Sequence, residues 1–140
     1  MQNECKPDDM FYIVASSFES LAFMEVHPGA PESFCIQNSI CASVIFEKPE
    51  PGGYAIYLPR PLAEELARNS MGEEEIGEEI LKDVVGEACN VIGGRAAAQE
   101  GALLLSSPEV CMSNCVIPSG ATIYYFQSIE NCFAVAKWRK

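Results

Sequence analysis

The sequence predicts an α+β domain in which a mostly antiparallel sheet carries two long helices packed on one face. Apolar residues recur at helical spacing near the start and in the middle of the chain. Other stretches are rich in β-branched residues and are separated by short glycine- and proline-containing turns. Such runs of hairpins favour segregated helices over a parallel strand–helix–strand sheet. With 140 residues, 49% of them hydrophobic, we expect residues 1–140 to form a single domain.

Proline and glycine residues mark the ends of the expected helices and strands. Pro7 suits a helix start, and the helical spacing stops at His27 and Pro28. Gly72 suits a left-handed cap at the end of a short helix. The expected order is a helix from residue 7 until residue 27, strands at 33–46 and 54–58 joined by a turn at 47–53, a helix at 62–70, a helix at 73–99, and strands at 101–105, 110–117, 121–127 and 132–138.

The long helix carries a polar stripe beside its apolar face. Helical geometry places the stripe residues within about 60° of one another, and they are Asp83, Glu87, Asn90 and Gly94. The neighbouring arc is expected to face the core and contains Ile80, Val84, Ala88, Val91 and Ile92. Glycines at 86, 93 and 94 each cost roughly 1 kcal/mol in a helix interior. We therefore expect close approach of another backbone there.

Composition narrows the function classes. The net charge is −11 and the nine Lys and Arg residues are scattered, which does not favour nucleic acid as a partner. No stretch has the length and apolar character of a membrane span, and the first residues lack a signal pattern, so we expect a cytoplasmic protein without membrane insertion. The acidic residues at 73–79 are either the solvated start of the long helix or a surface that attracts a protein partner carrying exposed lysines.

The seven cysteines do not form a recognisable metal motif. No CxxC pair occurs, and His27 is the single histidine. Most cysteines, including Cys89, are expected to be reduced structural residues. Cys111 and Cys115 could bind a metal with His27 only if the fold gathered them. The sequence also has no glycine-rich phosphate loop and no Ser/His/Asp set, which disfavours an enzyme for small metabolites.

The motif Asp83-x-x-x-Glu87-x-x-Asn90, followed by Pro108, resembles the signature of the CheC, CheX and FliY chemotaxis phosphatases, and CheX in particular. Residues 18–26 are also similar to the opening helix of CheX. The resemblance covers nearly the whole chain and implies a CheC/CheX-like fold. It further implies an activity that hydrolyses the aspartyl-phosphate of a CheY-like response-regulator receiver.

The resemblance also implies roles for individual residues. Asn90 would orient the attacking water and Glu87 would anchor the receiver through its lysine, so both are catalytic candidates. Asp83 would make a supporting contact, and Gly86 and Gly94 would leave room for the partner's backbone. Any Mg²⁺ would belong to the receiver, which leaves this chain without a cofactor of its own. CheX-like proteins commonly form homodimers through their sheets, so we expect a homodimer here.

Two other functions stay open. A non-catalytic module could bind the receiver or another chemotaxis protein without hydrolysis. The first helix keeps this alternative open, because Glu19 and Ala22 repeat the spacing of the motif without a carboxamide. A structural subunit is the other possibility, since flagellar-switch proteins share this architecture.

Overall fold

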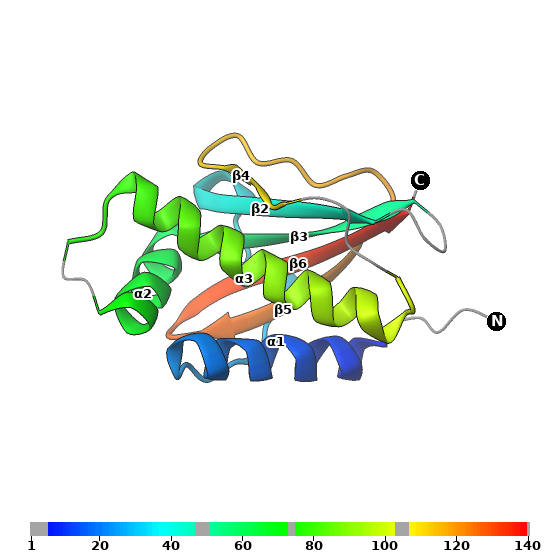
Figure 1. The fold of residues 1–140 in the computed structure, drawn as a ribbon, viewed down its shortest axis with the longest axis horizontal. Helices are drawn as coiled ribbons and strands as arrows, with labels where there is room; N and C mark the ends of the chain where they lie inside the picture. Colours follow the sequence, from blue (N-terminus) through cyan, green and yellow to red (C-terminus); the bar gives the residue numbers. More distant parts are fainter. Residues whose placement is uncertain (1–5, 47–50, 73–74, 103–106, 140) are drawn as a thin grey trace.

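A computed structural model describes residues 6–46, 51–72, 75–102 and 107–139 of the chain. Three helices lie against a six-stranded sheet (Figure 1). The helices are α1 (Pro7–Ala22), α2 (Arg60–Met71) and α3 (Glu78–Gln99). The strands are β1 (His27–Pro28), β2 (Ser39–Phe46), β3 (Gly52–Pro59), β4 (Glu109–Cys111), β5 (Thr122–Ser128) and β6 (Asn131–Arg139). The predicted α+β class is confirmed.

The sheet has the strand order β1-β5-β6-β3-β2-β4, and every neighbouring pair is antiparallel. Two hairpins, β2–β3 and β5–β6, make up most of it. Ile129 and Glu130 both have positive φ, 46° and 60°, at the tight turn between β5 and β6. This is the left-handed geometry that suits the twist of a two-residue hairpin turn. The two short strands, β1 and β4, form the opposite edges of the sheet.

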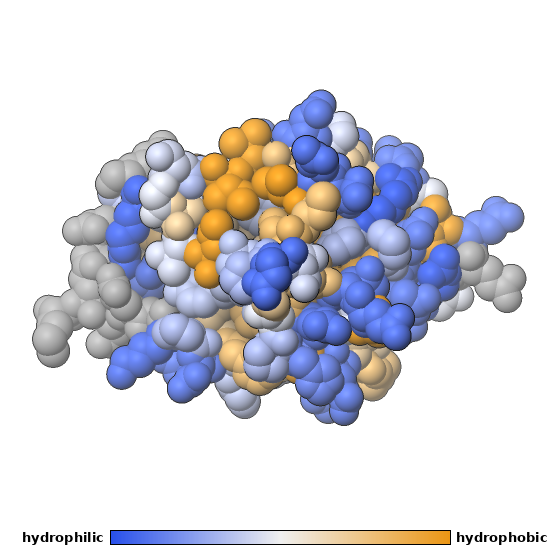
Figure 2. All heavy atoms as spheres, turned by 180° about the vertical axis from the view of Figure 1, so that it is seen from behind, coloured by the Kyte–Doolittle hydropathy of each residue, from blue (hydrophilic) through white to orange (hydrophobic). Residues whose placement is uncertain are grey.

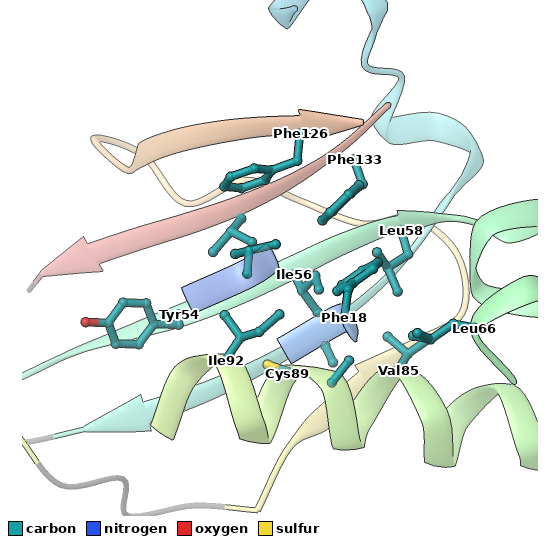
Figure 3. Packing of buried hydrophobic residues seen from close by; sticks show 14 of the residues in the cluster. Phe18, Tyr54, Ile56, Leu58, Leu66, Val85, Cys89, Ile92, Phe126 and Phe133 are labelled. Carbon is teal, nitrogen blue, oxygen red and sulfur yellow. The ribbon is translucent and has the colours of Figure 1, made fainter. Parts of the chain in front are cut away.

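The main core lies between the sheet and the helices. Phe18 of α1 stacks on Phe133 of β6 with ring centroids 4.8 Å apart. Figure 3 shows Val85, Cys89 and Ile92 pointing from α3 into the same layer. A second, smaller cluster covers the back of the sheet around Tyr57 and Ala134. The helices therefore occupy one face of the sheet, as predicted.

The helix predictions needed small corrections. Gly72 ends α2 in the left-handed conformation, with φ 70°, as predicted. The long helix begins at Glu78, whereas residue 73 was expected, and residues 73–74 lie outside the described part of the chain. Its core face is turned slightly from the predicted arc, because Val91 and Ile80 are only half-buried. Val84, Ala88 and Ile92 are buried as predicted. Leu81, Val85 and Cys89 are buried as well, although the predicted arc did not include them.

Several predicted strands are shorter than expected. The stretch at 33–46 begins with two 3₁₀ turns and becomes β2 only at Ser39. The prediction at 110–117 is wrong beyond Cys111, where the chain leaves the sheet edge and turns back over the rear face. There the Tyr57 hydroxyl donates a hydrogen bond of 2.8 Å to the Val116 carbonyl. In the predicted strand 101–105, Gly101 and Ala102 are not in a strand and the rest lies outside the described residues.

None of the helices in the described part of the chain combines the length and apolarity that crossing a membrane requires.

Candidate functional site

The polar stripe lies on the solvent side of α3. Val85, Cys89 and Ile92 hold the opposite side of this helix on the sheet. Asp83, Glu87 and Asn90 are all exposed. They have no hydrogen-bond or ion-pair partner among the described residues. The carboxylates and the carboxamide are therefore available to another molecule.

A polar hollow of about 380 Å³ opens beside the stripe. One wall comes from α3 and the other from the segment that enters β4. This segment reaches the helix because β4 pairs with β2 at the edge of the sheet, next to α3. The hollow is lined by Lys82, Asp83, Gly86, Glu87 and Asn90 from α3, with Pro108 and Val110 opposite. Pro108, the downstream proline of the motif, thus lies across the hollow from Asn90.

Gly86 forms the buried floor of this hollow. A Cβ atom at Gly86 would stand 3.4 Å from Val110 Cγ2 and 3.7 Å from Pro108 Cβ. Part of the space beside Gly86 is therefore occupied by the chain itself, while the glycine still lines the hollow, and its clearance for a partner's backbone stays a prediction. Gly93 has a related role, because its Cβ would stand only 2.7 Å from Val44 Cγ2. It lets α3 approach the sheet closely, whereas Gly94 is half-buried at the end of the stripe.

A second, apolar hollow of about 290 Å³ lies on the other side of the stripe. It is formed where the end of α1 and the second half of α2 meet α3, and it is lined by Leu21, Leu66, Ser70, Met71, Asp83, Val84 and Glu87. Asp83 and Glu87 line both hollows, so they form a ridge between them. Sequence reasoning missed this hollow because it depends on how α2 packs. The exposed Met71 at the end of a helix was the available signal.

The helix start adds negative charge to this region. Glu78 and Glu79 occupy the first turn of α3, one turn before the stripe. Glu78 forms an exposed ion pair with Arg60 at the start of α2. Exposed pairs of this kind contribute little to stability. Glu79 has no ion-pair partner among the described residues, so both readings of these acids, a solvated helix start and an attraction for a lysine-bearing partner, stay open.

The first helix does not build an equivalent site. Glu19 is exposed, but Ala22 is fully buried in the core. The position that corresponds to Asn90 in spacing therefore points inward. Within the described residues, α3 is where an exposed acid and carboxamide occur at this spacing.

The possible metal set of Cys111, Cys115 and His27 is not gathered. His27 lies in β1 at one edge of the sheet, and Cys111 lies in β4 at the opposite edge. Among the described residues, no group of His, Cys, Asp and Glu side chains has an arrangement that could hold a metal ion. The two cysteines do lie near each other, with Cys41 as their neighbour.

Comparisons with known proteins identify the family of this chain. The family model described as chemotaxis phosphatase CheX matches residues 40–118, a range that includes Glu87, Asn90 and Pro108. No curated protein sequence matches this chain significantly.

Solved structures share the fold across nearly the whole chain. A putative chemotaxis protein from Desulfovibrio vulgaris Hildenborough has a TM-score of 0.77 at 21% identity, with 100% of both chains covered. Chemotaxis protein CheX from Vibrio vulnificus has a TM-score of 0.77 at 20% identity, with 95% of both chains covered. In the CheX–CheY–BeF₃–Mg²⁺ complex from Borrelia burgdorferi, the matched chain has a TM-score of 0.69 at 17% identity, with 98% of this chain and 100% of that chain covered. Because the family model matches more than half of the sequence, the chain belongs to the CheX family of chemotaxis phosphatases.

Proposed function

We propose that this protein accelerates hydrolysis of the aspartyl-phosphate on a CheY-like receiver, with Asn90 orienting the attacking water and Glu87 anchoring the receiver. The observation that carries the proposal is the position of these two side chains. Both project from the exposed side of α3 beside the polar hollow, and neither is engaged by the described residues of its own chain. The family membership supports the same activity.

A carboxamide suits the proposed chemistry. Hydrolysis of an acyl phosphate needs a water held in line with the bond that breaks, and the negative charge of the phosphoryl oxygens must be neutralised. The amide of Asn90 can accept a hydrogen bond from the water and donate another to the phosphoryl group. Positioning of this kind can lower a barrier by several kcal/mol. The magnesium ion would be held by the receiver, and this chain would supply no cofactor.

Glu87 is suited to anchoring because its carboxylate is exposed and adjacent to Asn90 along the stripe. A lysine of the partner could form a charge-assisted hydrogen bond with it. The structural neighbour from Borrelia burgdorferi was solved as a complex of CheX with CheY, BeF₃ and Mg²⁺, which supports a receiver as the partner class. Asp83 would add a supporting contact on the same ridge, and Gly94 would leave room at its end.

The experiment compares receiver dephosphorylation with and without the carboxamide. A CheY-like receiver is phosphorylated with acetyl phosphate and Mg²⁺, and the decay of its phosphate is followed after addition of this protein. Asn90→Ala is expected to abolish the acceleration. Asn69→Ala, which removes an exposed carboxamide from α2, is the matched control and should leave it intact. Equal decay with wild type and Asn90→Ala contradicts the proposed catalytic role.

A non-catalytic receiver-binding module is the second candidate. It is favoured by α1, which offers an exposed Glu19 but a buried Ala22 in place of a second carboxamide. In that case the wild-type protein would capture the phosphorylated receiver without changing the decay of its phosphate. The same labelled receiver, immobilised for a pull-down, separates the two candidates.

We also propose that two copies associate through their sheets and that the protein acts in the cytoplasm, where a soluble receiver would meet it. Figure 2 shows apolar side chains gathered on the back face of the molecule. Val116 on the segment after β4 is 74% exposed. Light scattering should give the mass of a dimer, and Val116→Glu should shift it towards the monomer. A wild-type monomer at all concentrations contradicts the association.

A further inference from the structure

Three cysteines converge on the back face of the sheet, at the edge formed by β2 and β4. Cys41 of β2 and Cys111 of β4 are directly paired, so their side chains lie on the same face. Cys115 comes from the segment after β4. Its thiol donates to the Ser39 carbonyl at 3.1 Å and lies 3.7 Å from the Cys111 carbonyl oxygen. Residues more than sixty positions apart in the sequence thus bring their thiols together.

The environment differs between the members of this thiol cluster. Burial raises the pKa of the Cys41 thiol far above its ordinary value, and the neighbouring thiols of Cys115 and Cys111 raise it further. The nearby Tyr57 hydroxyl has a raised pKa for the same kinds of reason, burial first and then Cys41 and Cys115. Cys111, by contrast, is exposed. A reagent from solution therefore meets Cys111 more readily than the half-buried Cys41, which lies directly opposite it on β2.

We propose that Cys111 and Cys41 form an oxidation-sensitive pair that a peroxide converts into a cross-strand disulfide. Directly paired residues of antiparallel strands have Cα atoms roughly 4.5–5.5 Å apart, which lies within the range that a disulfide spans. The pairing of β2 with β4 therefore already supplies the distance. Neither the family membership nor the proposed phosphatase activity is needed for this inference.

The reaction consumes one peroxide for each disulfide. The Cys111 thiolate attacks one oxygen of hydrogen peroxide, and the O–O bond breaks. The attacked oxygen stays on Cys111 as a sulfenic acid, and the other oxygen departs as hydroxide. The Cys41 sulfur then attacks the Cys111 sulfur. The S–S bond forms, the S–O bond breaks, and the hydroxyl leaves as water with the Cys41 proton. Two thiols lose two hydrogens, and the peroxide is reduced to two waters.

The proposed disulfide between Cys41 and Cys111 would affect the wall of the polar hollow, because β4 forms part of that wall. Val110 lies between Glu109 and Cys111 and faces the other side of the sheet, where it contacts Gly86 of α3. It is also one wall of the polar hollow. A disulfide would tie this three-residue edge strand covalently to β2 and would fix that wall in place.

The test maps the bond in the wild-type protein. The reduced protein is treated with hydrogen peroxide, remaining thiols are alkylated with iodoacetamide, and peptides are analysed without reduction. We expect a linked peptide pair that joins Cys111 to Cys41, two hydrogens lighter than the sum of the free peptides. Cys111→Ser should lose this product. Cys35→Ser, which removes another exposed thiol, should keep it.

Two outcomes would overturn the proposal. One is the absence of the linked pair at peroxide concentrations that oxidise other exposed thiols. The other is a bond from Cys111 to Cys115 or to a second molecule in place of Cys41. A second readout is the melting temperature, which should rise on the order of 5–10 °C on oxidation and return after reduction, because the bond closes a long loop.

Discussion

Val110 of β4 lies against Gly86 of α3, and a Cβ atom on the glycine would stand 3.4 Å from Val110 Cγ2. This contact joins the edge of the sheet to the helix that carries Glu87 and Asn90. It also explains why the hollow has a closed floor. The helix and the edge strand together present the carboxamide, and each is held by its own contacts with β2.

The two helix glycines are predicted to respond in opposite directions to alanine. At Gly86 the new methyl group meets Val110 at an ordinary contact distance, so the better helix propensity of alanine should stabilise the protein by up to about 1 kcal/mol. At Gly93 the methyl group would stand 2.7 Å from Val44 Cγ2, and overpacking should cost about 1–3 kcal/mol. Urea unfolding of both variants measures the difference. Equal stabilities contradict the packing described for Gly93.

Replacing Glu87 is predicted to weaken receiver binding. An exposed carboxylate that accepts a charge-assisted hydrogen bond contributes about 1.5–3 kcal/mol, so Glu87→Ala should raise the Kd roughly 10- to 100-fold. Calorimetric titration with a receiver in the presence of BeF₃⁻ and Mg²⁺ measures this effect. Glu32→Ala removes an exposed carboxylate that lies outside α3, in the 3₁₀ turn Pro31–Ser33, and serves as the control. The same Kd for wild type and Glu87→Ala would exclude the anchoring role.

The polar stripe could be predicted from sequence because a helical period fixes the angle between Glu87 and Asn90. The hollows could not, because their far walls come from Met71 and Val110, whose positions depend on packing between distant segments. The predicted strand at 110–117 shows the same limit. Cys115 and Ile117 pack against the rear of the sheet, and the hydrogen bond from the Tyr57 hydroxyl to the Val116 carbonyl takes the place of a sheet ladder. Local composition does not distinguish an apolar segment that forms a strand from one that packs over the face of a sheet.

The apolar hollow is predicted to contribute to receiver affinity without affecting the chemical step. It shares Asp83 and Glu87 with the proposed site, and Met71 at its rim is 50% exposed. Met71→Glu should raise the KM for phosphorylated receiver several-fold while kcat stays within about twofold, since uniform binding affects KM alone. Tyr12→Glu changes an exposed aromatic on the surface of α1 and is the control. A fall in kcat with unchanged KM would contradict this role.

The end of α3 is predicted to depend on a buried carboxylate. Glu100 accepts hydrogen bonds from Lys137 at 2.5 Å, from Arg139 at 2.8 Å, and from the Tyr54 hydroxyl. Its side chain is 3% exposed. Glu100→Ala leaves the buried Lys137 without this carboxylate and should cost about 3–5 kcal/mol, which urea unfolding measures. Glu75→Ala, at an exposed position, should change stability by less than about 0.5 kcal/mol. A loss below 1 kcal/mol at Glu100 would show that the network contributes little.

Cys89 is predicted to make the protein less stable at alkaline pH. Burial raises the pKa of its thiol from 9.0 to about 12, so the folded protein keeps the proton that the unfolded chain releases. The stabilising contribution is complete below pH 9 and is lost as the pH rises from 9 towards 12. The loss approaches about 1.4 kcal/mol per pH unit for one proton. Urea unfolding between pH 8 and 10.5 should therefore show a steeper decline for wild type than for Cys89→Ala. Parallel declines would mean that this thiol ionises equally in both states and would contradict its burial beneath Glu87 and Asn90.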